Sequence, residues 1–232
     1  MIGTATMTLL DDRPAPEPPP TPSPRPVRTT ALRWLRSLVL FGVAVGLGLV
    51  AVQFGLRFFA PHAYAGTVFP SGSPAAPLDD LFYDNGEPVD LAAYEGRALM
   101  IYFGYTNCPD VCPMSLSVAA DAMDRLGDDA DDVAFMMISV DPDRDELPVL
   151  GDYVRQFDER FVGVGGGIDA ISEAAALYGV FFQCGEPTDD GRYLVDHTST
   201  LIGIDPSGEL KVLWNPDVTA DRLADDLRAM TA

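Results

Sequence analysis

The sequence predicts an α/β domain that follows a single membrane-spanning helix. Three observations lead to this prediction: one long apolar segment near the N-terminus, a later series of apolar runs that alternates between strand and helix patterns, and two cysteines at the first long strand-to-helix turn. The chain has 232 residues but only three cysteines. The part beyond the apolar segment is long enough to bury a core without disulfide bridges, so the cysteines are free for chemistry.

The apolar segment lies within residues 37–60. Between Leu38 and Leu56 its only strongly polar residue is Gln53, and about twenty such residues suffice for a helix to cross a bilayer. Arginines at positions 25, 28, 33 and 36 precede the segment, whereas only Arg57 follows it. This bias predicts a single-pass protein of the inner cell membrane with a cytoplasmic N-terminus and an extracytoplasmic, periplasmic C-terminal domain. We expect a retained signal anchor, although residues 63–65 have the small-x-small form that signal peptidase accepts.

Composition divides the chain into four parts. Residues 1–36 are predicted to be a cytoplasmic Pro-rich tail, because eight prolines occur within residues 14–26. The transmembrane segment (37–60) and a linker (61–77) rich in Gly, Ser and Pro separate this tail from the domain at 78–232. Residues 61–232 carry nine basic and 32 acidic side chains. Such a negative surface excludes nucleic acid and anionic lipid as partners. It is typical both of proteins that attract cations or a basic partner protein and of proteins adapted for solubility or salt.

The first elements of the domain have clear patterns. Residues 81–83 read as a short strand that enters a turn at 84–87, where Asp-Asn-Gly-Glu is typical of a tight reversal. Residues 98–103 are continuously apolar, which predicts a strand buried on both faces. From 111 to 126 apolar side chains recur at helical spacing and stop before Gly127. This pattern predicts an amphipathic helix.

The rest of the domain continues the alternation. Residues 133–140 are another fully apolar run and predict a central strand. We predict further helices at 147–157, 169–178 and 219–230, and further strands at 161–164, 193–195, 199–204 and 210–214. The predicted order is a strand, a helix, a strand and a helix, followed by a terminal hairpin and a last helix. This order is typical of a thioredoxin-like fold. Cysteines at the first long β-to-α turn agree with that plan.

The cysteine pair is the centre of the predicted site. Cys108 and Cys112 are four residues apart, so they share one helix face at a helix N-terminus, where thiolates are favoured. The spacing permits either a disulfide or a bound soft metal. His197 is the only histidine besides His62 of the linker. Two thiolates and an imidazole suit Cu(I), and one extra ligand would accommodate Cu(II), whereas zinc usually takes four protein ligands.

Three motifs resemble one family. They are Tyr-Phe-Gly-Tyr-Thr-Asn-Cys-Pro-Asp-Val-Cys-Pro at 102–113, Ser-Val-Asp-Pro-Asp-Arg-Asp at 139–145 and Asp-His-Thr-Ser at 196–199. Together they look like the SCO/SenC family, membrane-anchored thioredoxin-fold copper proteins of cytochrome c oxidase assembly. The resemblance covers roughly residues 78–230. It implies copper, as Cu(I) and/or Cu(II), bound by Cys108, Cys112 and His197.

The resemblance also implies a task and partners. The protein would deliver copper to the binuclear copper site of a cytochrome c oxidase subunit, or keep that subunit's cysteines reduced. Its partners would be this copper-bearing subunit and a copper donor protein. It would therefore be a metallochaperone rather than an enzyme in the strict sense.

Two other functions remain open from the sequence. A thiol–disulfide oxidoreductase would attack with Cys108 and resolve the mixed disulfide with Cys112, without obligatory copper. A thiol peroxidase would need an activated cysteine beside a threonine and an arginine. Thr106 is close to Cys108, but no arginine is near in sequence, so this alternative is the least favoured.

Several other residues have simpler interpretations. Cys184 is interpreted as a free loop cysteine, with a resolving thiol or an extra copper ligand as the alternative. The acidic residues of 141–145, together with Arg144, are predicted to form a turn and an N-cap for the following helix rather than a metal loop. His62 is predicted to be inert, and Asp196 is a weak candidate for orienting the imidazole. Three methionines are predicted to be packing residues: Met114, Met136 and Met137.

Overall fold

The computed structural model describes residues 28–58, 62–189 and 192–232. The proline-rich tract at 14–26 lies outside these described residues. The chain divides into two compact units, residues 1–60 and residues 61–232. Each unit is described separately below.

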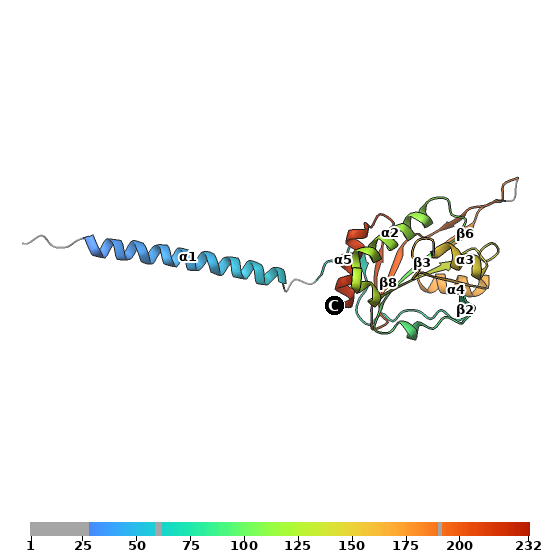
Figure 1. Ribbon diagram of the computed structural model, residues 1–232, viewed down its shortest axis with the longest axis horizontal. Helices are drawn as coiled ribbons and strands as arrows, with labels where there is room; N and C mark the ends of the chain where they lie inside the picture. Colours follow the sequence, from blue (N-terminus) through green and yellow to red (C-terminus); the bar gives the residue numbers. More distant parts are fainter. Residues whose placement is uncertain (1–27, 59–61, 190–191) are drawn as a thin grey trace, which may run out of the picture. The chain divides into compact units, whose positions relative to one another are not determined.

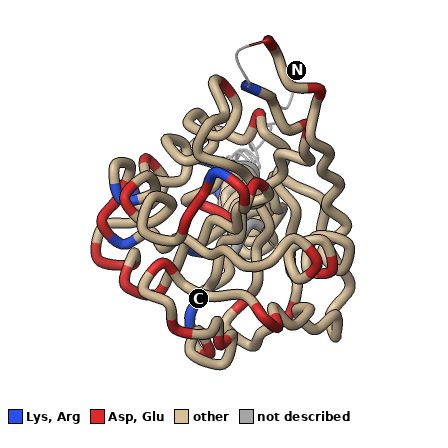
Figure 2. The backbone as a smooth tube through the Cα atoms, turned by 90° about the vertical axis from the view of Figure 1, so that its right-hand side faces the viewer, with Lys and Arg blue, Asp and Glu red and all other residues tan. Residues whose placement is uncertain are grey.

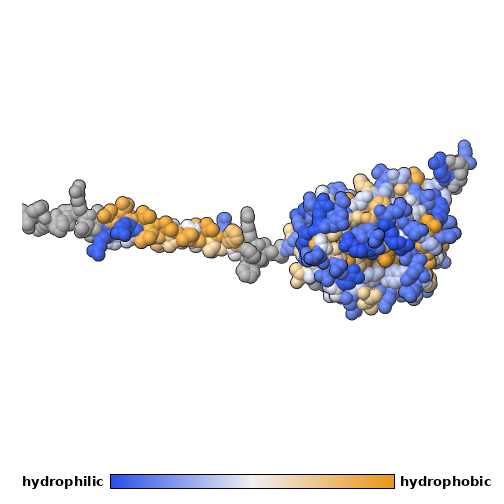
Figure 3. Space-filling model, viewed as in Figure 1, coloured by the Kyte–Doolittle hydropathy of each residue, from blue (hydrophilic) through white to orange (hydrophobic). Residues whose placement is uncertain are grey.

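The described part of the first unit is one long helix, α1 (Arg28–Phe58). Within it, Leu32–Leu56 is long and apolar enough to cross a membrane, and none of this span is buried against other parts of the protein. Figure 3 shows an almost continuous apolar surface along this helix. Leucine, valine and phenylalanine side chains are exposed on every side of this helix, and their exposure to water is unfavourable in free energy. The helix is therefore suited to anchoring the protein in a bilayer.

A seven-stranded sheet forms the centre of the second unit. Its strands lie in the order β1-β9-β8-β3-β4-β5-β2. They are β1 (Thr67–Val68), β2 (Leu81–Tyr83), β3 (Ala98–Gly104), β4 (Val133–Ser139), β5 (Val162–Gly166), β8 (Leu201–Ile204) and β9 (Leu210–Trp214). β3, β4 and β5 run parallel, whereas the other pairs are antiparallel. Every residue of β3 and β4 is buried, which explains why both sequences are apolar up to the final Ser139 of β4.

Helices cover both faces of this sheet. They are α2 (Val111–Leu126), α3 (Leu147–Val154), α4 (Ile168–Leu177) and α5 (Ala220–Thr231). α2 and α5 lie together on one face, and α3 and α4 lie on the other (Figure 1). Short 3₁₀ helices, η1 (Leu91–Tyr94) and η2 (Gly127–Asp132), complete the connections. This arrangement confirms the predicted thioredoxin-like α/β fold and the predicted helix near the N-terminus.

Some element boundaries differ from the prediction. α3 ends at Val154 rather than at Phe157, because Gln156 and Phe157 donate their amides three residues back in a tighter turn. A short strand, β6 (Phe182–Cys184), was not predicted. It pairs with β7 (Val195–His197) in a separate two-stranded sheet. His197 therefore ends a strand instead of lying between two strands.

The segment just before the sheet is attached to the domain. β1 pairs with β9, and the carboxylate of Asp226 on α5 binds the residues ahead of β1. His62 Nε2 lies 2.6 Å from Asp226 Oδ1, and the Ala65 amide donates to Oδ2 at 2.8 Å. Trp214 Nε1 also donates to Oδ2, at 2.7 Å. His62 is thus a partner of a fully buried carboxylate, and the prediction that it is inert was wrong.

Acidic side chains dominate the surface of the second unit. Figure 2 shows Asp and Glu distributed around it, with far fewer Lys and Arg. Several arginines form ion pairs with nearby aspartates, such as Arg155 with Asp84 at 2.5 Å. Because acidic residues far outnumber basic ones, most carboxylates have no such partner available and the surface stays strongly negative.

Candidate metal centre

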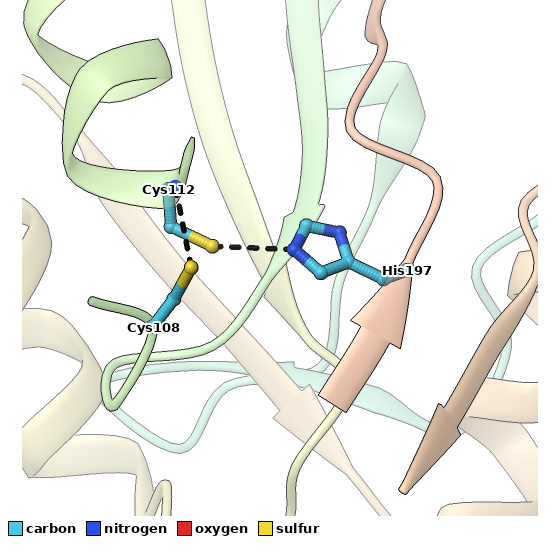
Figure 4. Close-up of side chains that lie close together, drawn as sticks. All are labelled: Cys108, Cys112 and His197. Carbon is cyan, nitrogen blue, oxygen red and sulfur yellow. Dashed lines mark hydrogen bonds between the residues drawn. The ribbon is translucent and has the colours of Figure 1, made fainter. Parts of the chain in front are cut away.

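Three side chains that could hold a metal converge at one end of the sheet. The Sγ atoms of Cys108 and Cys112 and a ring nitrogen of His197 all lie within 4.8 Å of one another. Figure 4 shows the two thiols and the imidazole pointing toward a common centre. The structure thus brings together all three residues that were predicted to bind a metal. They come from the loop after β3, the first turn of α2 and the end of β7.

The local sequence places the two thiols differently. β3 ends at Gly104, and a loop carrying Cys108 leads into α2, where Cys112 lies in the first turn. Cys112 is fully buried, whereas Cys108 is half-buried. The Cys112 amide points at Cys108 Sγ from 3.4 Å, which uses one of the free amides at the helix N-terminus. Cys108 is therefore the sulfur that an incoming group meets first.

Gly104 makes room for the buried thiol. A Cβ at this position would lie 3.1 Å from Cys112 Sγ and 2.6 Å from Cε1 of Tyr102. Both distances are shorter than ordinary contacts between carbon and these atoms. The glycine of the Tyr-Phe-Gly-Tyr sequence is thus required by the close packing around the site.

The contact with the Thr198 carbonyl favours one tautomer of the His197 imidazole. His197 Nδ1 lies 3.1 Å from the carbonyl oxygen of Thr198, and a carbonyl only accepts hydrogen bonds, so Nδ1 carries the proton. Nε2 is then the acceptor nitrogen, and it faces Cys112 Sγ at 3.4 Å, where it accepts a hydrogen bond from the neutral thiol. The rings of Tyr102 and Tyr105 stand edge-on to the imidazole, with centroids 6.0 and 5.8 Å away. The backbone, rather than the exposed Asp196, orients the ring.

Burial determines the protonation states of Cys112 and His197 in the metal-free protein. It raises the pKa of Cys112 to about 12 and lowers the pKa of His197 below its ordinary value. A neutral thiol therefore faces a neutral imidazole at pH 7. The hydroxyls of Tyr102 and Ser115 are buried without a hydrogen-bond partner among the described residues. The Tyr102 hydroxyl lies beside Cys112 and is a donor that a thiolate would satisfy, so the site fits a metal that deprotonates this sulfur.

Cys184 does not join this group. It lies on β6 opposite Val195, and its side chain is exposed. Desolvation and the nearby carboxylates of Asp141 and Asp143 raise its pKa, which keeps the thiol protonated and weakly nucleophilic. These properties agree with the interpretation of Cys184 as a free cysteine.

The acidic loop at 141–145 forms the predicted turn, with the amides of Arg144 and Asp145 donating to the Asp141 carbonyl, but not the predicted N-cap. The N-cap of α3 is Glu146 and makes no side-chain capping bond, so the N-cap prediction was wrong. Asp145 is buried and accepts from the Thr106 amide at 2.9 Å, the Thr106 hydroxyl at 2.5 Å and the Ser139 hydroxyl at 2.7 Å. It ties the loop before Cys108 to the end of β4. No local sequence signal indicated this long-range contact.

The methionines are divided between core and surface. Met136 and Met137 are buried in β4, as predicted for packing residues. Met114 is half exposed on α2, so its assignment to packing was wrong.

A cavity of about 500 Å³ opens beside the cysteine loop. Asn107 and Pro109, the neighbours of Cys108, form part of its wall, and Arg144 and Tyr193 form another part. A concave surface therefore adjoins the loop that carries the half-buried Cys108, although Cys108 itself is not part of the cavity wall.

Comparisons with known proteins agree with this geometry. A family model described as SCO1/SenC matches residues 80–232. The structure of Bradyrhizobium japonicum ScoI with copper bound is 33% identical, covers 72% of this chain and 99% of that chain, and has a TM-score of 0.60. The solution structure of apo Sco1 from Thermus thermophilus is 35% identical, covers 73% and 98%, and has a TM-score of 0.63.

Curated relatives match over the same domain. The mitochondrial SCO1 homolog of Homo sapiens is 36% identical over 126 residues, which is 53% of this chain and 42% of the relative. The mitochondrial SCO2 homolog of Mus musculus is 29% identical over 145 residues, 62% and 57% of the two chains. This chain therefore spans about half the length of these relatives. Because the family model matches well over half of the 232 residues, the chain belongs to the SCO1/SenC family.

Proposed function

We propose that the protein is a membrane-anchored assembly factor that binds copper through Cys108, Cys112 and His197. It delivers this copper to the binuclear copper site of cytochrome c oxidase, or keeps the cysteines of that site reduced. The observation that carries the proposal is the convergence of two thiols and an imidazole within 4.8 Å. Two sulfur ligands and one nitrogen ligand are suited to Cu(I). The copper-bound ScoI structure from a family member supports the choice of metal.

The unequal exposure of the ligands indicates how copper enters. The half-buried Cys108 receives the metal first, and the buried Cys112 and the Nε2 lone pair of His197 then complete the site. Cys112 must lose its proton in this step, since the thiolate is the ligand. Delivery reverses the sequence by ligand exchange with the recipient.

The location follows from the anchor and the charge bias around it. We place residues 1–36 in the cytoplasm as a tail, residues 37–60 in the inner membrane, and the linker (61–77) and the domain (78–232) on the extracytoplasmic side. The client is the copper-bearing subunit of the oxidase, and a separate donor protein supplies the metal. The membrane anchor supports this assignment, because it holds the domain at the membrane in which an oxidase resides.

A second candidate function is reduction of a client disulfide without obligatory copper. It is favoured by the partial exposure of Cys108 and by the position of Cys112 four residues later, in the first turn of α2. Cys108 as thiolate would attack one client sulfur and release the other as a thiolate. Cys112 would then attack Cys108, release the second client thiolate and leave a Cys108–Cys112 disulfide. Peroxidase chemistry is not favoured, because the Thr106 hydroxyl is bound to Asp145 rather than turned to a cysteine.

Copper loading tests the proposal. The reduced protein is loaded anaerobically with Cu(I), and stoichiometry and affinity are compared for wild type, His197→Ala and Cys184→Ser. We expect one tightly bound copper that is weakened by His197→Ala and unchanged in Cys184→Ser. Cys184→Ser is a matched control, because it removes a thiol outside the group of three.

The same variants also test the second candidate function, the reduction of a client disulfide without obligatory copper. Weak copper binding that does not depend on His197, together with rapid dithiol exchange by Cys108 and Cys112, would contradict copper delivery. The oxidoreductase would then be the better description, because thiol exchange does not require the imidazole.

A further inference from the structure

The hairpin that carries His197 lies outside the main sheet. Among the described strands, β6 and β7 pair with each other and with no strand of the seven-stranded sheet. Phe182 faces His197 in this pair, and Cys184 faces Val195. The hydrogen-bond ladders that fix β3 therefore do not fix His197. Its distance from the two thiols depends on contacts between the hairpin and the rest of the unit.

Arg144 supplies two of these contacts. It lies in the loop between β4 and α3, and its Nη1 donates to the carbonyl oxygen of Tyr193 at 3.0 Å. Its guanidinium carbon also lies 3.6 Å from the centre of the Tyr193 ring, which is a close cation–π contact. Tyr193 precedes the first residue of β7 by two positions. Arg144 thus holds both the backbone and the side chain of the segment that leads to His197.

Asp141 completes the arrangement. Its Oδ2 accepts from Arg144 Nε at 2.5 Å, and its Oδ1 accepts from the Tyr193 hydroxyl at 2.7 Å. Asp141 is 1% exposed, so the carboxylate is stabilised by these partners rather than by water. Asp141, Arg144 and Tyr193 form a closed set of contacts, which we call the Arg144 clamp.

The Arg144 clamp also reaches the other side of the metal centre through Tyr105. The guanidinium carbon of Arg144 is 5.8 Å from the Tyr105 ring, and the Val195 amide donates to the Tyr105 hydroxyl at 3.2 Å. The Tyr105 ring in turn stands edge-on to the imidazole of His197. Tyr105 lies in the loop that carries Cys108. The Arg144 clamp therefore contacts both the loop that carries Cys108 and the segment that leads to His197. These two segments must keep their relative positions for the three side chains to meet.

We propose that Arg144 is a positioning residue for His197: through the Arg144 clamp it holds β7 so that Nε2 faces the cysteine pair. This inference rests on the proposed copper site. It differs from a general contribution to folding, because the clamp joins a loop to a separate hairpin and lies outside the ladders of the main sheet. Side chains that orient a metal ligand typically change metal affinity about 10- to 100-fold when they are replaced.

The test uses the full chain in detergent micelles. Cu(I) affinity is measured by competition with a chromophoric chelator for wild type, Arg144→Gln, His197→Ala and the double variant. The Cu(II) forms are compared by electron paramagnetic resonance, which detects nitrogen coordination. The matched control is Arg155→Gln, because Arg155 forms an ion pair with Asp84 on another part of the unit.

We expect Arg144→Gln to weaken Cu(I) binding by at least about tenfold and to reduce the nitrogen signal. Arg155→Gln should change neither. In the His197→Ala background, Arg144→Gln should have no further effect, because the ligand it positions is already absent. Where Arg144→Gln does not fold, Tyr193→Phe removes only the hydroxyl that binds Asp141 and is expected to cause a smaller change of the same kind.

Two results would overturn the inference. One is wild-type affinity and an unchanged nitrogen signal in a folded Arg144→Gln or Tyr193→Phe protein. The other is an equal loss of affinity with and without His197, which would show that Arg144 acts elsewhere. If His197→Ala itself binds copper like wild type, the proposed copper site fails independently, and the role of Arg144 in it fails too.

Discussion

Gly104 and Cys112 occupy complementary space, since the missing side chain of one leaves room for the sulfur of the other. A Cβ on Gly104 would come within 3.1 Å of Cys112 Sγ and 2.6 Å of the Tyr102 ring. We expect Gly104→Ala to destabilise the protein by about 1–3 kcal/mol, as in other overpacked cores. It should also weaken copper binding, because Cys112 must move.

Denaturant unfolding and copper titration check this prediction. Gly167→Ala is the matched control, because no atom lies within 4 Å of a Cβ there and Gly167 has an ordinary φ of −68°. An unchanged midpoint and unchanged copper affinity in Gly104→Ala would show that the site adapts to the added methyl group.

Asp145→Asn should loosen the loop before Cys108. The carboxylate accepts three hydrogen bonds from Thr106 and Ser139 in a buried position, and an amide accepts fewer while adding donors without partners. We expect a loss of about 3 kcal/mol in the free energy of unfolding. Asp143→Asn in the same loop is exposed and serves as the control. Equal stability of the two variants would contradict the structural role of Asp145.

Copper affinity should increase with pH. Burial raises the pKa of Cys112 to about 12, so this thiol is protonated at neutral pH and must release its proton when it binds the metal. Raising the pH from 7 to 9 therefore favours binding, by about tenfold per pH unit for each proton released. His197 has a lowered pKa and is already neutral in this range, so it contributes no proton.

Competition titrations at several pH values measure this slope. Cys112→Ser should lower the slope by one proton, whereas His197→Gln should leave it unchanged. An affinity that does not depend on pH between 7 and 9 would contradict a neutral Cys112 thiol in the metal-free protein.

Asp226→Asn should detach the segment ahead of β1. Asp226 accepts hydrogen bonds from Ala65 and Trp214 and pairs with His62, and it is fully buried. We expect a loss of about 2–4 kcal/mol of stability. Because His62→Ala removes a partner of the same carboxylate, the two substitutions should not be additive.

Thermal or denaturant unfolding of the single and double variants measures this coupling. Asp225→Asn is the control, because Asp225 is exposed on the same helix. Full additivity of Asp226→Asn and His62→Ala would show that the His62 contact contributes nothing to the folded state.

The sequence predicted the fold through its most regular parts. β4 is apolar from Val133 to Ile138 because helices cover both faces of this strand, and this pattern identified a central strand. Val111–Leu126 showed helical spacing because one face of α2 packs in the core. β6 was missed because it has three residues, of which Gln183 and Cys184 are exposed, so it has no periodic pattern.

The three residues proposed to bind copper were easier to predict than the residues that hold them in place. Cys108, Cys112 and His197 could be proposed from residue type and scarcity. Arg144 and Asp145 could not, because they act on Tyr193 and Thr106, which are 49 and 39 residues away in the chain. The local composition of this loop is equally typical of a turn, and only the fold shows which side chains it contacts. His62 was misjudged for the same reason, since its partner is 164 residues away.

The separate β6–β7 sheet has a consequence for the dynamics of the site. A short two-stranded sheet opens at a lower free energy than strands in the middle of a large sheet. Local opening can therefore move the imidazole away from the two thiols, while the cysteine loop and the seven-stranded sheet remain folded. Amide hydrogens of Val195–His197 should exchange with solvent faster than those of β3. Release of copper would then be governed by the opening equilibrium of a few residues rather than by the stability of the whole domain.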